Sequence, residues 1–256
     1  MGMCLVSFCR GCEKRSMIDF RKLTDVEPAL QLSPLLRAAH RTMQYAAENN
    51  GIGLTATKAF QRKFVHWAVE HVDWPGYGPA EAFSVSKVVN EYEFPPIQVV
   101  HFLLLQLKLG RHYKGKFLLT RKGKDLLTTP GVLFGELIPF FLLEVDHTSD
   151  GRLDERPFGT WDVWLNVMNV ELEQGLTERQ LYGLFYGDGP DWDNAGWREL
   201  AAFSSYVLKP LEWAGLISVH EVEGGSRRDW MCFKTALWRE ALRLETDDEV
   251  PAGVQH

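Results

Sequence analysis

The chain has 256 residues, of which 45% are hydrophobic and 12% aromatic, so it can bury a sizeable core in one large domain or two ordinary ones. Its net charge is −6, and its best membrane candidate, residues 132–143, has about half of the roughly 20 apolar residues that a spanning helix needs. These features argue against a membrane protein, and residues 1–15 lack a convincing secretory leader, so we expect a cytoplasmic protein with no membrane partner.

Cysteine is scarce in this chain. Four cysteines are too few and too unevenly spaced for a disulfide framework, so reduced thiols are expected. Cys9 and Cys12 have the C-x-x-C spacing of a zinc site, and Cys4 could be a third ligand. The nearest histidine, His40, lies well outside the motif, and an ordinary flexible N-terminus is the alternative interpretation.

The two halves of the chain carry opposite charge. Residues 1–130 contain 18 Lys or Arg and 11 Asp or Glu, a net +7, whereas residues 131–256 contain 10 and 23, a net −13. Such asymmetry indicates either charged partners or docking of the halves on each other.

The first 50 residues are expected to form an N-terminal arm followed by a helix. Ser33 is a favourable N-cap and Pro34 suits the first turn. Apolar residues then recur at helical spacing until the sequence ENNGIG ends the pattern.

A first domain is expected over residues 51–129. It begins with the extended segment IGLT and continues with helices over residues 57–72, 84–91 and 95–109. The sequence HYKGKFLLT predicts a small hairpin centred on residues 114–116, and Thr120 is placed to cap a helix through RKGKDLL.

The second half repeats this order after a connector, residues 130–158, whose apolar sequence predicts a buried helix kinked or divided at Pro139. Residues 159–245 form the second predicted domain: three helices, a hairpin with the turn EGGSRR, and a final helix that follows Thr235. Residues 246–256 are expected to be a disordered acidic tail. The predicted fold class is mainly α with small β-hairpins (α+β), in two domains joined by a buried helical connector.

Three helices and a two-stranded hairpin, carried by LLLQLKLGRHYKGKFLLTRKGKDLL, resemble the winged-helix superfamily, and the second domain resembles it in the same way. The resemblance covers residues 51–128 and 159–244 as tandem copies. In winged-helix proteins that bind DNA, the third helix enters the major groove and the wing reaches phosphates. The resemblance therefore implies double-stranded DNA as a partner and a role in transcription regulation.

Six Lys or Arg residues lie between positions 111 and 124, on the predicted wing and the following helix, with no acidic residue among them. Such cations neutralise phosphate charge, and polar neighbours can bond to sugar or phosphate. The predicted nucleic-acid-binding residues here are Arg111, His112, Tyr113, Lys114, Lys116, Arg121, Lys122 and Lys124. The alternative is a solvated hairpin whose lysines keep an edge strand from pairing with other chains.

The third helix of the first copy is apolar almost all round, which favours burial. Its polar strip, Gln98, His101 and Lys108, completes the predicted interface, and Gln98 could read an adenine edge. The second copy is acidic and holds most of the tryptophans. The alternative function is therefore a protein–protein assembly module, with a protein partner on the acidic, Trp-rich half.

Catalytic motifs are missing from the sequence: it has no phosphate loop, nucleophile elbow, dinucleotide fingerprint or H-E-x-x-H. The segment DHTSDGRLDERP, residues 146–157, resembles a calcium loop, but Pro157 stands where a bidentate carboxylate is required. We expect a non-enzymatic protein without a cofactor.

Overall fold

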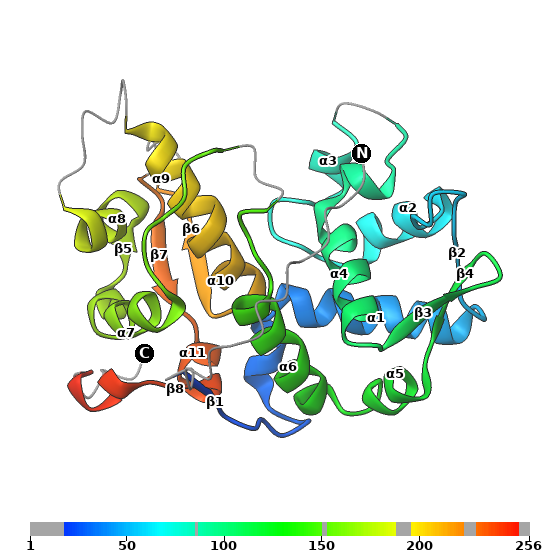
Figure 1. The fold of residues 1–256 in the computed structure, drawn as a ribbon, viewed down its shortest axis with the longest axis horizontal. Helices are drawn as coiled ribbons and strands as arrows, with labels where there is room; N and C mark the ends of the chain where they lie inside the picture. The colour runs from blue at the N-terminus through cyan, green and yellow to red at the C-terminus, as the bar shows by residue number, and fades with distance from the viewer. Residues whose placement is uncertain (1–17, 85–86, 150–152, 188–195, 223–228, 251–256) are drawn as a thin grey trace.

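The computed structural model describes residues 18–84, 87–149, 153–187, 196–222 and 229–250. Helices dominate the described chain, and its strands form small antiparallel sheets of two or three strands (Figure 1). The predicted fold class is confirmed, since the protein is mainly α within an α+β fold of two domains.

The first unit, blue to green in Figure 1, combines a three-stranded sheet of order β2-β4-β3 with helices packed against it. Helix α1 contacts α4 and β4 of this unit, and it also contacts α10 of the second unit. The elements are α1 (Pro34–Glu48), β2 (Ile52–Gly53), α2 (Arg62–His71), α3 (Pro79–Ala82), the 3-10 helix η2 (Glu91–Glu93), α4 (Pro95–Gln106), β3 (Gly110–Tyr113), β4 (Lys116–Leu119) and α5 (Arg121–Leu126).

The second unit, yellow-green to red-orange in Figure 1, repeats this arrangement with a sheet of order β5-β7-β6. In both units the short first strand pairs with the second strand of the hairpin. The elements are α7 (Trp161–Glu171), η4 (Leu172–Gln174), β5 (Leu176–Thr177), α8 (Glu178–Tyr186), α9 (Trp197–Phe203), the π-helix η5 (Ser204–Leu208), α10 (Lys209–Ala214), β6 (Ile217–His220), β7 (Met231–Lys234) and α11 (Ala236–Ala241).

The same hydrogen bonds close the hairpin in each unit. Thr120 N donates to Leu109 O and Thr235 N donates to Leu216 O, both at 3.0 Å. Each threonine hydroxyl also donates to a carbonyl just before the hairpin, at 2.7 Å for Thr120 and 2.6 Å for Thr235. The internal repeat expected from the sequence is therefore present in hydrogen bonding as well as in element order.

Local sequence signals set several element ends where they were predicted. The Ser33 hydroxyl accepts from Leu36 N at 3.2 Å and caps α1, and the Thr120 hydroxyl accepts from Gly123 N at 3.1 Å and caps α5. Lys114 and Gly115 both have positive φ, 47° and 74°, as the type I′ turn of a two-residue hairpin requires.

One predicted helix is not found in the described residues, and two predicted helix boundaries were wrong. In the described part of residues 84–91 the chain is irregular until η2 begins, because valines disfavour helix and Asn90 instead caps η2. Helix α2 starts at Arg62, since residues 55–59 form a turn in which Lys58 has a positive φ of 67°. Helix α4 ends at Gln106.

The connector joins the two units through one continuous core. Helix α6 (Pro130–Pro139) is followed by the π-helix η3 (Phe140–Glu144), so the predicted division at Pro139 is observed. Between the units, the Trp213 ring lies edge-on to Trp74 at 5.0 Å and parallel to Phe141 at 6.5 Å, and Lys209 Nζ donates to the Tyr77 hydroxyl at 2.9 Å. Most buried apolar residues of both units belong to a single cluster.

The two ends of the described chain meet. Strand β1 (Asp19–Phe20) pairs with β8 (Leu242–Arg243), and the 3-10 helix η1 (Pro28–Leu32) contacts α11. Residues 245–249, expected in part as disordered tail, form the 3-10 helix η7 (Glu245–Glu249), because Thr246 and Asp247 bond to side chains of α7. Among the described helices, none combines the length and apolar character needed to cross a bilayer.

Candidate nucleic-acid interface

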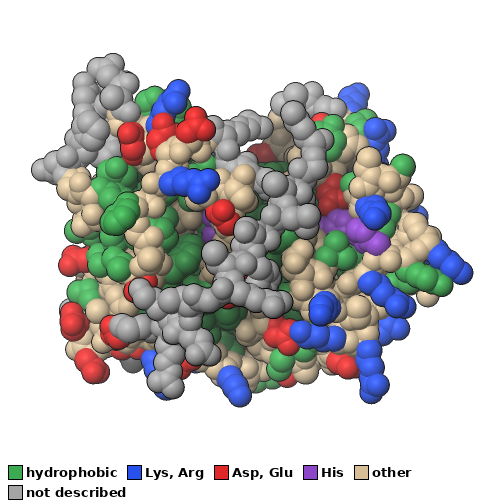
Figure 2. All heavy atoms as spheres, viewed as in Figure 1, with side chains coloured by type: hydrophobic (Ala, Val, Ile, Leu, Met, Phe, Trp, Pro, Cys, Tyr) green, Lys and Arg blue, Asp and Glu red, His purple; other side chains and the backbone are tan. Residues whose placement is uncertain are grey.

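The basic residues predicted as contacts gather on the β3–β4 hairpin and on α5. Figure 2 shows Lys and Arg side chains over this edge of the molecule, whereas Asp and Glu are frequent over the second unit. All six basic side chains are exposed: Arg111, Lys114 and Lys116 on the hairpin, and Arg121, Lys122 and Lys124 on α5. The structure therefore brings this predicted set onto one edge of the first unit.

Most of these charges are not neutralised by ion pairs within the described chain. Lys122 pairs with Glu136 of α6, and it is the one residue of the six in an ion pair among the described residues. Arg111 and Lys114 lie over the Tyr113 ring, 5.5 and 5.3 Å from its centroid. Tyr113 therefore positions two cations at the hairpin tip while remaining 49% exposed.

The predicted polar strip of α4 is not one exposed surface. Gln98 and Lys108 are exposed, but His101 between them is only 6% exposed and points into the core. Both of its ring nitrogens have protein partners. The prediction that His101 contacts nucleic acid directly was wrong, because the side chain is buried. The turn of α4 that carries it faces Phe60 and η2.

A hydrogen-bonded chain of side chains, buried except at its last residue, runs from η2 through α4 to the hairpin. Glu91 Oε1 lies 2.7 Å from His101 Nδ1, and His101 Nε2 lies 2.8 Å from His112 Nε2. The other carboxylate oxygen of Glu91 accepts from Phe60 N, and the Phe60 ring stacks on the His101 ring at 3.8 Å. We call Glu91, His101 and His112 the Glu-His-His chain.

His112 is the partly exposed end of this chain. Its pKa is lowered from the ordinary value of 6.5, first by burial and then by the nearby His101 and the positive charge of Lys58, and Glu91 partly opposes this shift. The imidazole of His112 therefore favours its neutral form in the free protein.

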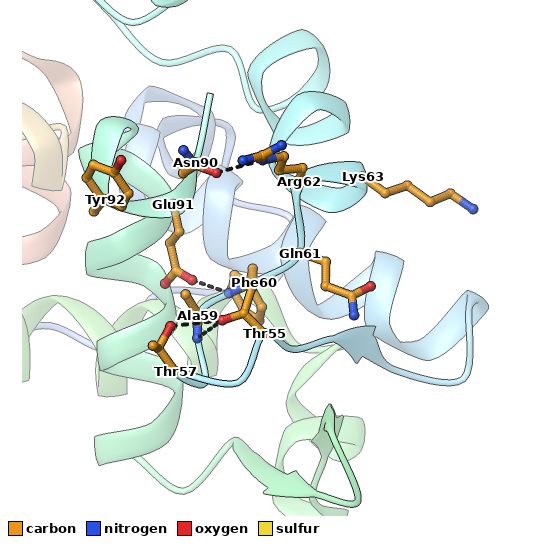
Figure 3. Close-up of a pocket in the computed structure, with 10 residues that line it drawn as sticks. All are labelled: Thr55, Thr57, Ala59, Phe60, Gln61, Arg62, Lys63, Asn90, Glu91 and Tyr92. Atoms are coloured by element: carbon orange, nitrogen blue, oxygen red, sulfur yellow. Dashed lines mark hydrogen bonds between the residues drawn. The ribbon is translucent and has the colours of Figure 1, made fainter. Parts of the chain in front are cut away.

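A surface pocket of about 690 Å³ opens beside the Glu-His-His chain. Figure 3 shows Glu91 pointing toward Phe60 and Lys63 extending away from the pocket. Arg62 Nε donates to Asn90 Oδ1 at 2.8 Å. The ten lining residues come from the turn before α2, from the start of α2 and from η2: Thr55, Thr57, Ala59, Phe60, Gln61, Arg62, Lys63, Asn90, Glu91 and Tyr92.

Sequence reasoning missed Glu91, Phe60 and Lys58 as neighbours of the interface. Glu91 was expected at the end of a helix, and Phe60 lay inside a predicted helix. Phe60 is 31 positions from Glu91 and 41 from His101, a separation that no short motif spans. Only the folded structure reveals that Glu91 and Phe60 meet His101 and that Lys58 lies near His112. The signal that was available is the Asn90–Glu93 capping box, which marks the start of η2.

Several residues that the sequence suggested as ligands or contacts lie outside the described residues. They are Cys4, Cys9 and Cys12, and Asp150 of the calcium-like segment. Among the residues that the structure describes, no group of three or more His, Cys, Asp or Glu is arranged to hold a metal ion.

Comparison with known proteins divides the chain at the connector. Residues 31–132 match the family model of the Y4jL N-terminal domain, and residues 151–236 match that of the y4jL C-terminal domain. The uncharacterized protein y4jL of Sinorhizobium fredii (strain NBRC 101917 / NGR234) is 38% identical over 178 residues, which cover 69% of this chain and 80% of that relative. No solved structure matches the chain. This similarity across both units shows that the chain belongs to the y4jL family.

Proposed function

We propose that this chain is a non-enzymatic, cytoplasmic DNA-binding protein of winged-helix type that regulates transcription. The basic β3–β4 hairpin of the first unit acts as the wing, and its cations contact phosphates of double-stranded DNA. The observation that carries this proposal is the exposed edge of Lys and Arg residues on the hairpin and α5, of which only Lys122 has an ion-pair partner within the described residues.

The topology of both units supports the winged-helix assignment. In each unit a helix and a short strand precede further helices and a hairpin, and the short strand pairs with the returning hairpin strand. In DNA-binding proteins that resemble this arrangement, the helix before the hairpin lies in the major groove. Helix α4 holds that position in the first unit.

The contacts divide into two kinds. Arg111, Lys114 and Lys116 on the hairpin, with Arg121 and Lys124 on α5, bind phosphates without reading sequence. Gln98, which is exposed on α4, reads a base edge in this proposal, and Lys108 lies just after that helix ends. His101 makes no direct contact and instead supports His112.

The test measures binding of random-sequence duplex DNA over a salt series. Replacing Lys114, Lys116, Arg121 and Lys124 together by Gln is expected to weaken binding equally across sequences. It also flattens the slope of log affinity against log salt, because each lost phosphate contact removes about 0.9 from that slope. Wild-type protein that fails to bind even at low salt would overturn the proposal.

A matched control separates local contacts from net charge. Lys22, Lys87, Arg198 and Arg243 are also exposed, and none of them lies on the hairpin, on α5 or on a helix that packs against α5. Replacing these four by Gln removes the same charge and should leave most of the affinity and its salt slope in place. An equal loss in both variants would mean that DNA binding depends on overall charge and not on the wing.

A second candidate function is a protein-interaction module, favoured by apolar side chains exposed on the acidic second half of the chain. Phe158 is 91% exposed and Leu184 45% exposed. Side chains of this kind are typical of protein interfaces. The candidate gains support if the chain does not bind DNA and if Phe158→Ser abolishes a complex that in-cell cross-linking detects for the wild-type chain.

A further inference from the structure

We propose that His112 is a phosphate contact that takes up one proton when DNA binds, supported by its hydrogen bonds through His101 to Glu91. This inference rests on the proposed DNA binding. It adds a specific ring nitrogen, His112 Nδ1, and a linked proton to the phosphate-binding surface.

The geometry leaves one ring nitrogen for a ligand. His112 lies on β3, the edge strand of its sheet, and is partly exposed. Its Nε2 is held by His101 at 2.8 Å, and among the described residues no hydrogen bond is made by its Nδ1. The other two residues of the Glu-His-His chain are held in place by packing. Glu91 and His101 are each 6% exposed, and the His101 ring is stacked on Phe60.

Counting protons decides what this nitrogen can do. A neutral imidazole carries one N–H and an ionised carboxylate carries none, so two protons suffice for the two hydrogen bonds of the Glu-His-His chain. His112 then donates from Nε2 and presents an unprotonated Nδ1. A phosphate oxygen only accepts, so a bond to it needs a third N–H, and both existing bonds can persist only if a proton is added.

The site of the added proton does not change this count. Whether His101 or His112 formally carries the charge, three hydrogen bonds require three protons. The Glu-His-His chain has a net charge of −1 with two protons and is neutral with three. Phosphate is therefore repelled by the first state and tolerated by the second, which couples binding to proton uptake.

The charged or titratable groups that face His112 are Lys58 before α2, Glu91 of η2 and His101 of α4. Burial, His101 and Lys58 hold the pKa of His112 below 6.5 in the free protein, and Glu91 opposes them. A phosphate close to Nδ1 adds negative charge and raises that pKa. Between the free and bound pKa values, one proton enters with each bound molecule.

Two measurements test this on the full chain. Fluorescence anisotropy with random-sequence duplex DNA, at constant ionic strength between about pH 5.5 and 8, is expected to show affinity that falls as pH rises, by up to about tenfold per pH unit for one proton. Calorimetric titration in two buffers of different ionisation enthalpy should detect uptake of up to one proton per complex. Phosphodiesters do not titrate in this range, so the proton belongs to the protein.

Variants assign the proton to His112. His112→Gln keeps an N–H donor that needs no added proton, so it is expected to bind DNA with an affinity that depends much less on pH. His220→Gln, which removes an exposed imidazole from β6 in the second unit, should keep the wild-type pH dependence.

The outcomes separate this inference from the proposed function. Wild-type binding that is salt-dependent but independent of pH, or His112→Gln that retains the full pH dependence, would overturn the proton-linked contact and leave DNA binding in place. Absence of DNA binding at low salt would overturn both.

Discussion

Two glycines in consecutive helices, one in α5 and one in α6, occupy opposite environments. Gly123 in α5 is buried, and a Cβ at this position would lie 2.1 Å from the carbonyl oxygen of Leu109. Gly135 in α6 is exposed, and a Cβ there would have no atom within 4 Å. The close approach at Gly123 holds α5 against the segment that leads into the hairpin, so this glycine helps to place the basic side chains.

Replacing each glycine by Ala should therefore change the free energy of unfolding in opposite directions. Gly135→Ala is expected to raise the free energy of unfolding by about 0.5–1 kcal/mol, because Ala is the better helix former. Gly123→Ala is expected to lower it by about 1–3 kcal/mol, since backbone must move to admit the methyl group. Urea denaturation measures both, and equal stabilisation of the two variants would contradict the packing at Leu109.

His147, which follows η3, should make the free energy of unfolding depend on pH. Its ring lies edge-on to Phe141 at 4.8 Å and to Trp161 at 5.9 Å, and its buried Nε2 has no partner among the described residues. Burial lowers its pKa from 6.5 to about 4. The folded state therefore binds fewer protons than the unfolded state in this interval, so the free energy of unfolding should fall as pH decreases from about 6.5 toward 4.

The measurement is urea denaturation at several pH values for the wild type and His147→Gln. The variant should lose part of the decrease in stability over this interval, because Gln does not titrate. His220→Gln, at an exposed position, is the control and should follow the wild-type profile. Identical profiles for all three chains would show that His147 is not the acid-sensitive group.

At the scale of elements, the two hairpins are closed by equivalent threonines whose hydroxyls make different sets of hydrogen bonds. The Thr120 hydroxyl both donates to Lys108 O and accepts from Gly123 N, whereas the Thr235 hydroxyl donates to Gly215 O and makes no cap bond to α11. One hydroxyl thus joins helix, turn and hairpin in the first unit. The hairpin that carries the proposed DNA contacts is the more firmly anchored of the two.

Replacing these threonines by Val keeps the side-chain shape and removes the hydroxyl. Thr120→Val is expected to cost about 1–2 kcal/mol more in unfolding free energy than a neutral substitution, because a cap and a donor are lost together. Thr235→Val should cost less, since only the donor is lost. Denaturation curves of the two variants compare these costs, and a larger loss at Thr235 would contradict the assignment.

Local signals explain which elements were predictable. Ser33 with Pro34, Thr120, and the turn at Lys114 act on residues adjacent in sequence, so α1, α5 and the hairpin followed from the sequence. The Glu-His-His chain did not, because Glu91, His101 and His112 come from three elements that meet only after folding. The prediction of a helix over residues 84–91 was wrong for a local reason. Asn is favoured at the start of a helix and disfavoured in its interior, so Asn90 begins η2 and does not continue an earlier helix.

At the scale of the whole molecule, the two units form one packed body. Charge contributes little to the stability of the contact between them. The contact at Trp213 joins Trp74 of the first unit and Phe141 of the connector, and Lys209 lies over both the Trp213 and Tyr77 rings. Burial of this aromatic cluster outweighs exposed ion pairs, which are worth about 0–1 kcal/mol each. The opposite charges of the two halves were visible in the sequence, whereas the aromatic contact was not.

Calorimetry should therefore show one unfolding transition for the full chain. Trp213→Ala removes the aromatic contact between the units and is expected to lower the transition temperature and broaden or split the transition. Trp197→Ala, in the same unit but 38% exposed, is the control and should have a much smaller effect. Two independent transitions in the wild-type chain would show that the units do not unfold together.

The pairing of β1 with β8 has a mechanical consequence. Asp19 faces Arg243 and Phe20 faces Leu242, in antiparallel register, so a force that pulls the two ends of the described chain apart reaches this pair from one side. The strands then peel apart one residue pair at a time instead of sliding past each other. On the C-terminal side the load first meets η7 and its hydrogen bonds to α7, so η7 and the β1–β8 pair are the first contacts that tension on the two ends would open, ahead of the contact between the units.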